Sequence, residues 1–170
     1  WSRTASGRRA RLVVKGGFAF FWGQWPSNWE PSPFVLEAVR YSCVEQWMMA
    51  EKARLFGDGA TRRAILEARS PARQKALGRA VRGFDERTWA RHRYSIVLAG
   101  TVAKYAQNPD LRRLLFATGN LLFVAASPED PIWGIGMGTD DPNLLARRRW
   151  GQNLRGRAVT EARAILSSRR

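Results

Sequence analysis

An acidic and a basic side chain share one face of a helix that the sequence predicts in the first third of the chain. Glu45, Met48, Met49 and Lys52 follow the i, i+3, i+4, i+7 spacing of a single helical face. A carboxylate and an ammonium group on a face otherwise lined by methionine are poorly placed for solvent. Buried groups of these two types serve as general acids, general bases and nucleophiles in enzymes. Glu51 points away from this face, and we expect it to be a solvated charge.

The same glutamate also has a purely structural interpretation. Ser42 and Glu45 have the Ser-x-x-Glu spacing of a capping box, in which the glutamate side chain satisfies a backbone N–H at the start of the helix. On the local pattern alone, this capping role is favoured over catalysis.

A second candidate site is a glycine-rich run that follows Asp130. Gly134, Gly136 and Gly138 alternate with apolar residues directly after Trp133. Bare backbone beside an indole suits the close approach of a flat ring or a phosphate. The run lacks the lysine and the strand–turn–helix frame of a P-loop. A tight loop that packs on the core through Trp133 is the alternative interpretation.

A third candidate is a proline-punctuated loop over residues 22–33, in which aromatic and small polar side chains alternate. They are Trp22, Gln24, Trp25, Ser27, Asn28 and Trp29. Such a loop could stack a nucleobase and read its polar edge. Tryptophans beside prolines can equally close off a small hydrophobic core.

Metal and thiol chemistry find little support in the sequence. The chain has one cysteine, Cys43, and one histidine, His92, so neither an intramolecular disulfide nor a thiolate zinc site is expected. His92 lies between two arginines in the middle of a predicted helix, where a surface position is expected. Cys43 has no evident histidine partner and is expected to pack beneath the helix start. We therefore predict no metal and no cofactor.

The charge balance is strongly basic, with 29 Lys and Arg against 14 Asp and Glu and a net charge of +15. This field would concentrate a polyanion such as nucleic acid or a phosphosugar, although a solubilising arginine-rich surface explains it equally well. No stretch is apolar for long enough to cross a membrane, and none has the pattern of an export signal. A cytoplasmic location without membrane association is therefore expected. Part of the excess charge lies near the chain ends, in Arg3, Arg8, Arg9, Arg11, Arg169 and Arg170.

The pattern of apolar and turn residues predicts a mostly helical α+β fold with a few short strands. A disordered basic arm over residues 1–11 precedes a single domain over residues 12–168. The loops 22–33 and 127–143 are long enough to suggest function. The expected strands are 17–22, 34–36, 39–41 and 121–125, and the expected helices are 42–56, 70–82, 85–106, a short one around 111–115, and 153–166, with helical pattern resuming near Leu144.

Several segments, in order along nearly the whole chain, resemble the NADAR family (NAD- and ADP-ribose-associated), also called YbiA-like. The segments that carry the resemblance are Ser27-Asn28-Trp29, Val44-Glu45-Gln46-Trp47-Met48-Met49-Ala50-Glu51-Lys52-Ala53, Val81-Arg82-Gly83-Phe84-Asp85 with Trp89, Lys104-Tyr105-x-Gln107-Asn108-Pro109, Ile132-Trp133-Gly134-Ile135-Gly136, and Asn153-Leu154-x-Gly156.

This resemblance implies a YbiA-like fold and N-glycosidase chemistry. Because the sequence has no metal-ligand cluster, we predict that the hydrolase is metal-independent. Known members hydrolyse ribosylamino intermediates of the riboflavin pathway, or remove ADP-ribose from guanine in nucleic acid. The functional glutamate of the family falls on Glu45 and its lysine on Lys52, so catalysis becomes favoured over capping, although one residue could serve both roles. Asp130 is the nearest candidate for a second acid. The residues expected to bind substrate are Trp22, Ser27, Asn28, Trp89, Trp133, Gly134, Gly136 and Asn153.

Two departures from the family pattern bear on the substrate and on the level of activity. Riboflavin-type members carry an aspartate directly after the Trp-Gly pair, where this chain has Ile135. This difference favours the ADP-ribosyl-guanine group. Arginines over 147–149 and 155–157 also replace largely apolar family positions. A riboflavin-intermediate glycosidase and a non-catalytic module that binds ADP-ribose or nucleic acid remain the alternative functions, and the oligomeric state is not predicted.

Overall fold

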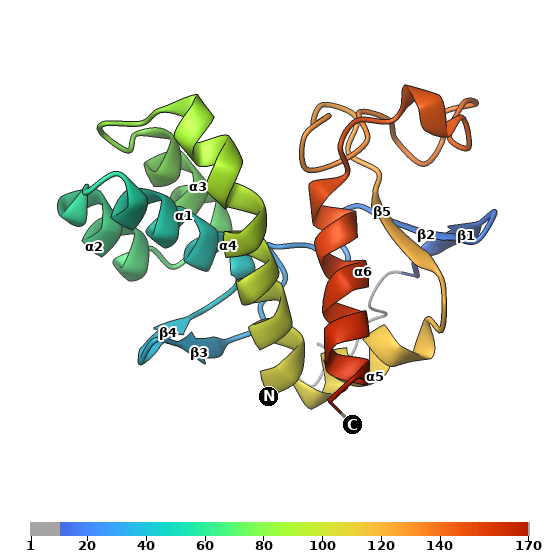
Figure 1. Ribbon diagram of the computed structural model, residues 1–170, viewed down its shortest axis with the longest axis horizontal. Coiled ribbons are helices and arrows are strands. Elements are labelled where there is room, and N and C mark those ends of the chain that lie inside the picture. Colours follow the sequence, from blue (N-terminus) through green and yellow to red (C-terminus); the bar gives the residue numbers. More distant parts are fainter. Residues whose placement is uncertain (1–10, 170) are drawn as a thin grey trace, which may run out of the picture.

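The computed structural model describes residues 11–169, so the predicted disordered arm lies outside the described residues except for Arg11. The α+β prediction is confirmed: helices dominate, and the strands are short (Figure 1). None of the helices in this range is long and apolar enough to cross a membrane. The elements are β1 (Val13–Lys15), β2 (Phe18–Phe21), β3 (Phe34–Leu36), β4 (Val39–Tyr41), α1 (Val44–Leu55), α2 (Gly59–Glu67), α3 (Pro71–Arg79), α4 (Glu86–Gln107), α5 (Pro109–Ala117), β5 (Leu122–Ala125), the 3-10 turn η1 (Arg147–Arg149) and α6 (Leu154–Ser167).

One small sheet joins the first two strands of the described chain to the strand that follows α5. Its strand order is β1-β2-β5, and β5 runs parallel to β2, with Phe18 opposite Leu122 and Phe21 opposite Ala125. A parallel pair needs a long crossover, which here contains α1 to α5. Helix α6 packs on β5 and lies alongside α4, as Figure 1 shows. The predicted hairpin of β3 and β4 is confirmed as a separate two-stranded sheet.

Helix α1 is the buried centre of the helical half. It packs against α2, α3 and α4, and nine of its residues are buried. The backbones approach closely at two glycines, because a Cβ on Gly78 would lie 1.9 Å from the Met49 sulfur and one on Gly100 would lie 2.4 Å from the Trp47 ring. The prediction of a solvated Glu51 is wrong: its side chain is 3% exposed and accepts hydrogen bonds from Arg54 Nε at 2.9 and 3.0 Å.

Three local features differ from the sequence prediction. Helix α2 was not predicted; it begins at the N-cap Asp58, which accepts a hydrogen bond from the Thr61 backbone N–H. Helix α3 begins after Ser70 as expected but ends at Arg79, three residues early. Strand β1 was also not predicted, because its three residues are exposed and carry no burial pattern.

A buried lysine of α4 holds the loop over residues 22–33 against that helix. Lys104 is 1% exposed, and its Nζ donates to the backbone oxygens of Trp25 at 2.8 Å and Ser27 at 2.9 Å. Since an ammonium group is costly to bury without acceptors, these bonds fix the loop against the helix. The loop therefore has a defined course where it passes the start of α1.

Lys104→Met should destabilise the fold by about 2–5 kcal/mol, because two buried carbonyl oxygens lose their donor while the apolar volume is kept. Urea unfolding of the two proteins measures the difference. Lys15→Met, at an exposed position on β1, is the control and should change stability by no more than about 0.5 kcal/mol. If Lys104→Met lowered the free energy of unfolding by no more than the control does, the loop would be held by other contacts.

Candidate active site

Glu45 lies in the first turn of α1 and is withdrawn from solvent, with 2% of its side chain exposed. Its backbone N–H donates to the Asn28 backbone oxygen at 3.0 Å, so the loop over residues 22–33 is fixed directly beside it. Burial raises the pKa of Glu45. Arg155, Lys75 and a hydrogen bond with the Trp29 side chain oppose this rise in pKa. The result is a shielded carboxylate among cations.

The capping interpretation of Glu45 is wrong. The N-cap of α1 is Cys43, which makes no side-chain capping hydrogen bond. Gln46, not Glu45, reaches back to the chain before the helix and accepts from the Ser42 backbone N–H at 2.7 Å. The Glu45 carboxylate is therefore left to face the cationic cluster.

Three basic side chains from α3 and α6 act electrostatically on the carboxylate. Lys75, Arg79 and Arg155 all stabilise the ionised form of Glu45. Arg155 is half-buried, its Nε has no hydrogen-bond partner within the described residues, and burial lowers its pKa while Glu45 and Asp130 act in the opposite direction. Lys75 and Arg79 are one helical turn apart on α3, so that spacing was the only sequence signal for this cluster.

Lys52 continues the site along the same face of α1, as the sequence predicted. Its Nζ lies 4.3 Å from the centroid of the Phe84 ring and 5.6 Å from that of Trp89. Burial lowers the pKa of Lys52; Glu86 opposes this effect, Arg79 adds to it and Glu45 opposes it more weakly. An amine held between aromatic rings with a depressed pKa is more often neutral than a surface lysine.

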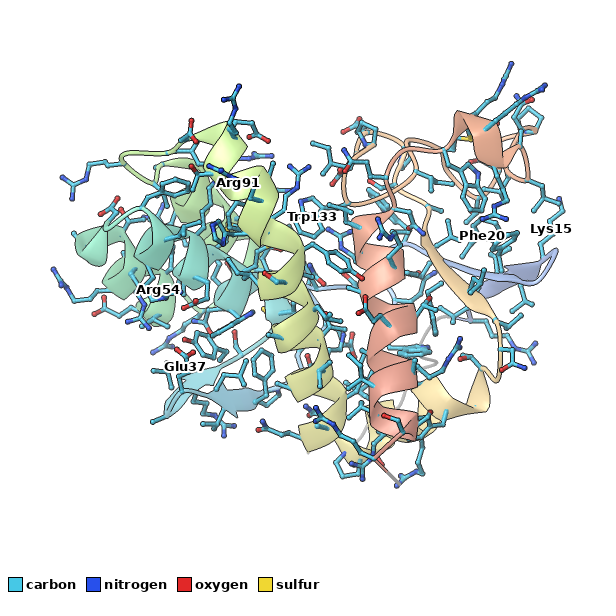
Figure 2. All side chains as sticks on the ribbon, in the orientation of Figure 1. Lys15, Phe20, Glu37, Arg54, Arg91 and Trp133 are labelled. Atoms are coloured by element: carbon cyan, nitrogen blue, oxygen red, sulfur yellow. The ribbon has the colours of Figure 1, made fainter. Side chains whose placement is uncertain are left out.

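Asp130 organises the glycine-rich loop beside the cluster. Its Oδ1 accepts from the backbone N–H groups of Ile132 at 3.0 Å and Trp133 at 2.8 Å, and its charge acts on Arg155. Trp133 is half-buried and packs on the core around α1; Figure 2 places it between α4 and α6. Asp130 thus positions Trp133, and its proposed role as a second acid remains a prediction.

The two glycines predicted to bind substrate have separate backbone functions. A Cβ on Gly134 would lie 2.7 Å from the Ala125 oxygen, so this position requires the close approach of two backbone segments. Gly136 has φ of +72°, a conformation that favours glycine. Both shape the loop that carries Trp133.

Asn28 keeps an unused donor at the site. The residue is 2% exposed, and its Nδ2 has no hydrogen-bond partner within residues 11–169. The Ser27 hydroxyl accepts from the Trp29 backbone N–H at 3.2 Å and so supports the turn. Leaving a buried amide donor without an acceptor costs folding free energy.

Two predicted binding residues have other surroundings. The Asn153 amide is occupied by β5, since its Oδ1 accepts from the Ala125 N–H at 2.9 Å and its Nδ2 donates to the Phe123 oxygen at 3.0 Å. We therefore assign it a positioning role in place of substrate contact. Trp22 lies just beyond β2 and is 54% exposed, whereas Trp29, which the sequence did not predict as a binding residue, is the loop tryptophan that contacts Glu45.

Glu45→Gln should make the fold more stable at neutral pH. The raised pKa of Glu45 means that ionisation costs folding free energy, and this cost is fully present above the folded pKa and absent below the ordinary value of about 4.3. The gain over wild type should therefore shrink as the pH falls through this window, which urea unfolding at a series of pH values measures. Glu51→Gln, which loses its Arg54 hydrogen bonds, should instead destabilise. A stability difference that is independent of pH would contradict the assignment.

The chain matches the NADAR domain over residues 19–167, nearly the whole of the described structure. It belongs to the NADAR family. It is 40% identical over 142 residues to an N-glycosidase of Acanthamoeba polyphaga mimivirus, covering 82% of this chain and 84% of the relative. It is 32% identical over 157 residues to the protein irg-1 of Caenorhabditis elegans, covering 85% and 74%. An N-glycosidase of Nostoc punctiforme is 29% identical over 121 residues, covering 71% and 78%.

The fold of this NADAR chain is that of YbiA. The solved structure of the Escherichia coli protein YbiA aligns with a TM-score of 0.74, at 23% identity, over 95% of this chain and 91% of that one. Two of the sequence relatives are named N-glycosidases, which confirms the prediction of a hydrolase that acts on N-glycosyl bonds.

Proposed function

We propose that this NADAR domain removes ADP-ribose from ADP-ribosylated guanine in nucleic acid. It does so by hydrolysing the bond between guanine and C1 of the ribose that belongs to the ADP-ribosyl group. The observation that carries the proposal is the buried Glu45 carboxylate, on which the charges of Arg155, Lys75 and Arg79 act. Breaking a glycosidic C–N bond builds positive charge on the sugar, which an anionic group at close range stabilises. The cations suit the diphosphate of the same substrate.

Glu45 has two tasks in this reaction. Ionised, it stabilises the cationic sugar while the base departs. Because burial raises the pKa of Glu45, the carboxylate also becomes a better proton acceptor than a surface glutamate. It is thus suited to take the proton of an attacking nucleophile and to pass it to the departing base.

Lys52 is the proposed nucleophile. Burial lowers the pKa of Lys52, so the amine is more readily neutral. Its nitrogen forms a bond to C1 of ribose as the bond between C1 and the base breaks. The base leaves with a proton. Opening of the sugar ring then converts the adduct to an imine, and the ring oxygen is protonated to a hydroxyl. Water then hydrolyses the imine, which restores the amine and releases ADP-ribose.

The aromatic and amide groups fix the substrate around these two residues. Trp89 and Trp133 both pack at the core that surrounds α1, and Trp89 lies beside Lys52. Flat rings of this kind hold a nucleobase or a sugar face. The unused Nδ2 donor of Asn28 supports recognition of an acceptor on the base or on ribose.

The guanine assignment over riboflavin intermediates is supported by position 135. Ile135 is buried in a hydrophobic cluster with Phe20 and Val124, so the site has no second carboxylate at this point. By the family resemblance, riboflavin-type members have an aspartate there. A hydrophobic anchor at 135 is therefore consistent with the ADP-ribosyl-guanine group.

Incubation with two substrates in parallel tests the proposal. An oligonucleotide that carries ADP-ribosylated guanine and a ribosylaminouracil phosphate are each mixed with the protein, and mass spectrometry identifies the released sugars. We expect ADP-ribose from the first and no ribose 5-phosphate from the second. Ribose 5-phosphate release alone would assign the riboflavin-type activity. Binding with both substrates left intact would support the non-catalytic module.

A further inference from the structure

A groove separate from Glu45 lies between β5, α6 and the segment around η1. Its volume is about 740 Å³, within the range of sites that bind small ligands. Glu45, Lys52 and Asp130 are absent from its lining, so it is not the candidate active site. Its lining includes Phe18, Arg147, Arg148, Trp150 and Arg157.

The lining is basic. Three arginines contribute to it, against one carboxylate, Glu161, which already accepts a hydrogen bond from the Tyr94 hydroxyl. Arg147, Arg148 and Arg157 are exposed, and none makes an ion pair within residues 11–169. Three guanidinium groups without a carboxylate partner leave their charge for an external anion.

The same groove contains aromatic rings arranged for stacking. Phe18 and Trp150 meet edge to face at 5.1 Å, and the Trp150 indole N–H is fixed by the Leu144 oxygen at 2.8 Å. The Arg147 guanidinium lies 5.5 Å from the Phe18 ring and 5.9 Å from the Trp150 ring. Both rings remain half-buried, so one edge of this cluster faces the groove.

The groove is joined to the active site through a short backbone ladder. Its wall over residues 151–153 donates hydrogen bonds to the oxygens of Ile135, Pro131 and Gly134 at 3.0, 2.7 and 3.0 Å. The segment that accepts them carries Trp133. On the first turns of α6, Arg155 is directed to Glu45 while Arg157, about 200° further round the helix, lines the groove.

We infer that this groove binds a single-stranded stretch of the nucleic acid that carries the modified base, with phosphates on Arg147 and Arg148 and an unpaired base against Phe18 and Trp150. Free guanidinium groups combined with accessible rings are the combination by which proteins hold single strands. The arginines at 147 and 148 thereby acquire a function. The inference rests on the proposed function only in taking the bound strand to be the substrate of the reaction at Glu45. Binding of a single strand in the groove does not depend on that reaction.

Fluorescence anisotropy with an unmodified single-stranded oligonucleotide, over a series of salt concentrations, tests the binding. The groove variant is Arg147→Ser/Arg148→Ser. The control is Arg40→Ser/Arg63→Ser, which removes the same charge from exposed positions on β4 and α2. Circular dichroism and thermal melting verify that both variants are folded.

In the groove variant we expect the plot of the logarithm of the binding constant against the logarithm of the salt concentration to become less steep by about 1.4. Each lost phosphate contact on a single strand reduces the magnitude of this slope by about 0.7. Affinity at low salt should fall on the order of tenfold, whereas the control should change by no more than about twofold. Equal losses in both variants would overturn the inference, as would binding to duplex DNA or to anionic vesicles that exceeds binding to the single strand.

A second arm separates this inference from the proposed function. Turnover is measured on an ADP-ribosylated guanosine monophosphate and on an oligonucleotide with the same modification. The groove variant should have the kcat/KM of wild type on the monophosphate and a lower kcat/KM than wild type on the oligonucleotide. If the variant has the kcat/KM of wild type on both substrates, the groove inference is wrong while the proposed activity stands. If wild type cleaves neither substrate but its binding still depends on the groove, the activity is wrong while the groove inference stands.

Discussion

Glu45→Gln lowers kcat on the ADP-ribosylated substrate on the order of 10²-fold or more, which is the scale of losing a general acid–base group. Glutamine keeps the volume of the side chain but removes the charge that stabilises the cationic sugar and the basic site that carries the proton. Substrate affinity should change little, because the cations Lys75, Arg79 and Arg155 remain. Single-turnover kinetics separates the two effects.

Glu51→Gln is the matched control for this experiment. Glu51 is also a buried carboxylate of α1, but its partner is Arg54 and it does not contact the cationic cluster. The control should retain kcat to within about threefold, since it lies outside the proposed site. Near-normal turnover in a folded Glu45→Gln variant would remove this residue from the mechanism.

Lys52→Met abolishes covalent trapping and lowers kcat on the order of 10²-fold or more, as expected for loss of a nucleophile whose chemistry no neighbour replaces. Sodium borohydride added during turnover should reduce the imine, and intact-protein mass spectrometry should then find wild type heavier by one ADP-ribosyl unit. The adduct should map to Lys52.

Lys75→Met serves as the comparison for the lysine experiment. Lys75 belongs to the cations around Glu45, with its ammonium 5.9 Å from the Trp29 ring, and we expect it to bind phosphate. This variant should raise KM and still form the trapped adduct. If wild type forms no adduct while Lys52→Met raises KM alone, Lys52 anchors phosphate and the reaction proceeds through water.

The fold was predictable where local signals are strong. Helix α4 begins after the cap Asp85 and ends before Asn108-Pro109 as expected, because both ends are set by residues within one turn. Helix α2 escaped prediction because it is only nine residues long and Ile65 is its one buried residue. Its place is set by contacts with α1, which the sequence around it does not reveal.

The site was predictable along α1 and hidden elsewhere. Spacing places Glu45 and Lys52 on one face, but the same reasoning assigned Glu51 to solvent because it assumes that a helix has a wet side. Helix α1 is covered by α2, α3 and α4, so its opposite face is also buried. The cations Lys75 and Arg155 come from helices about eighty residues apart, and only tertiary packing brings them to the carboxylate.

A crystal structure of the Glu45→Gln variant with ADP-ribosylated guanosine monophosphate tests the central claim most directly. The account predicts that C1 of the bound ribose lies about 3–3.5 Å from the side chain at position 45 and within reach of the Lys52 nitrogen, as a near-attack geometry requires. The diphosphate should contact Lys75, Arg79 or Arg155. A sugar bound away from position 45, with the cluster of cations empty, would contradict it.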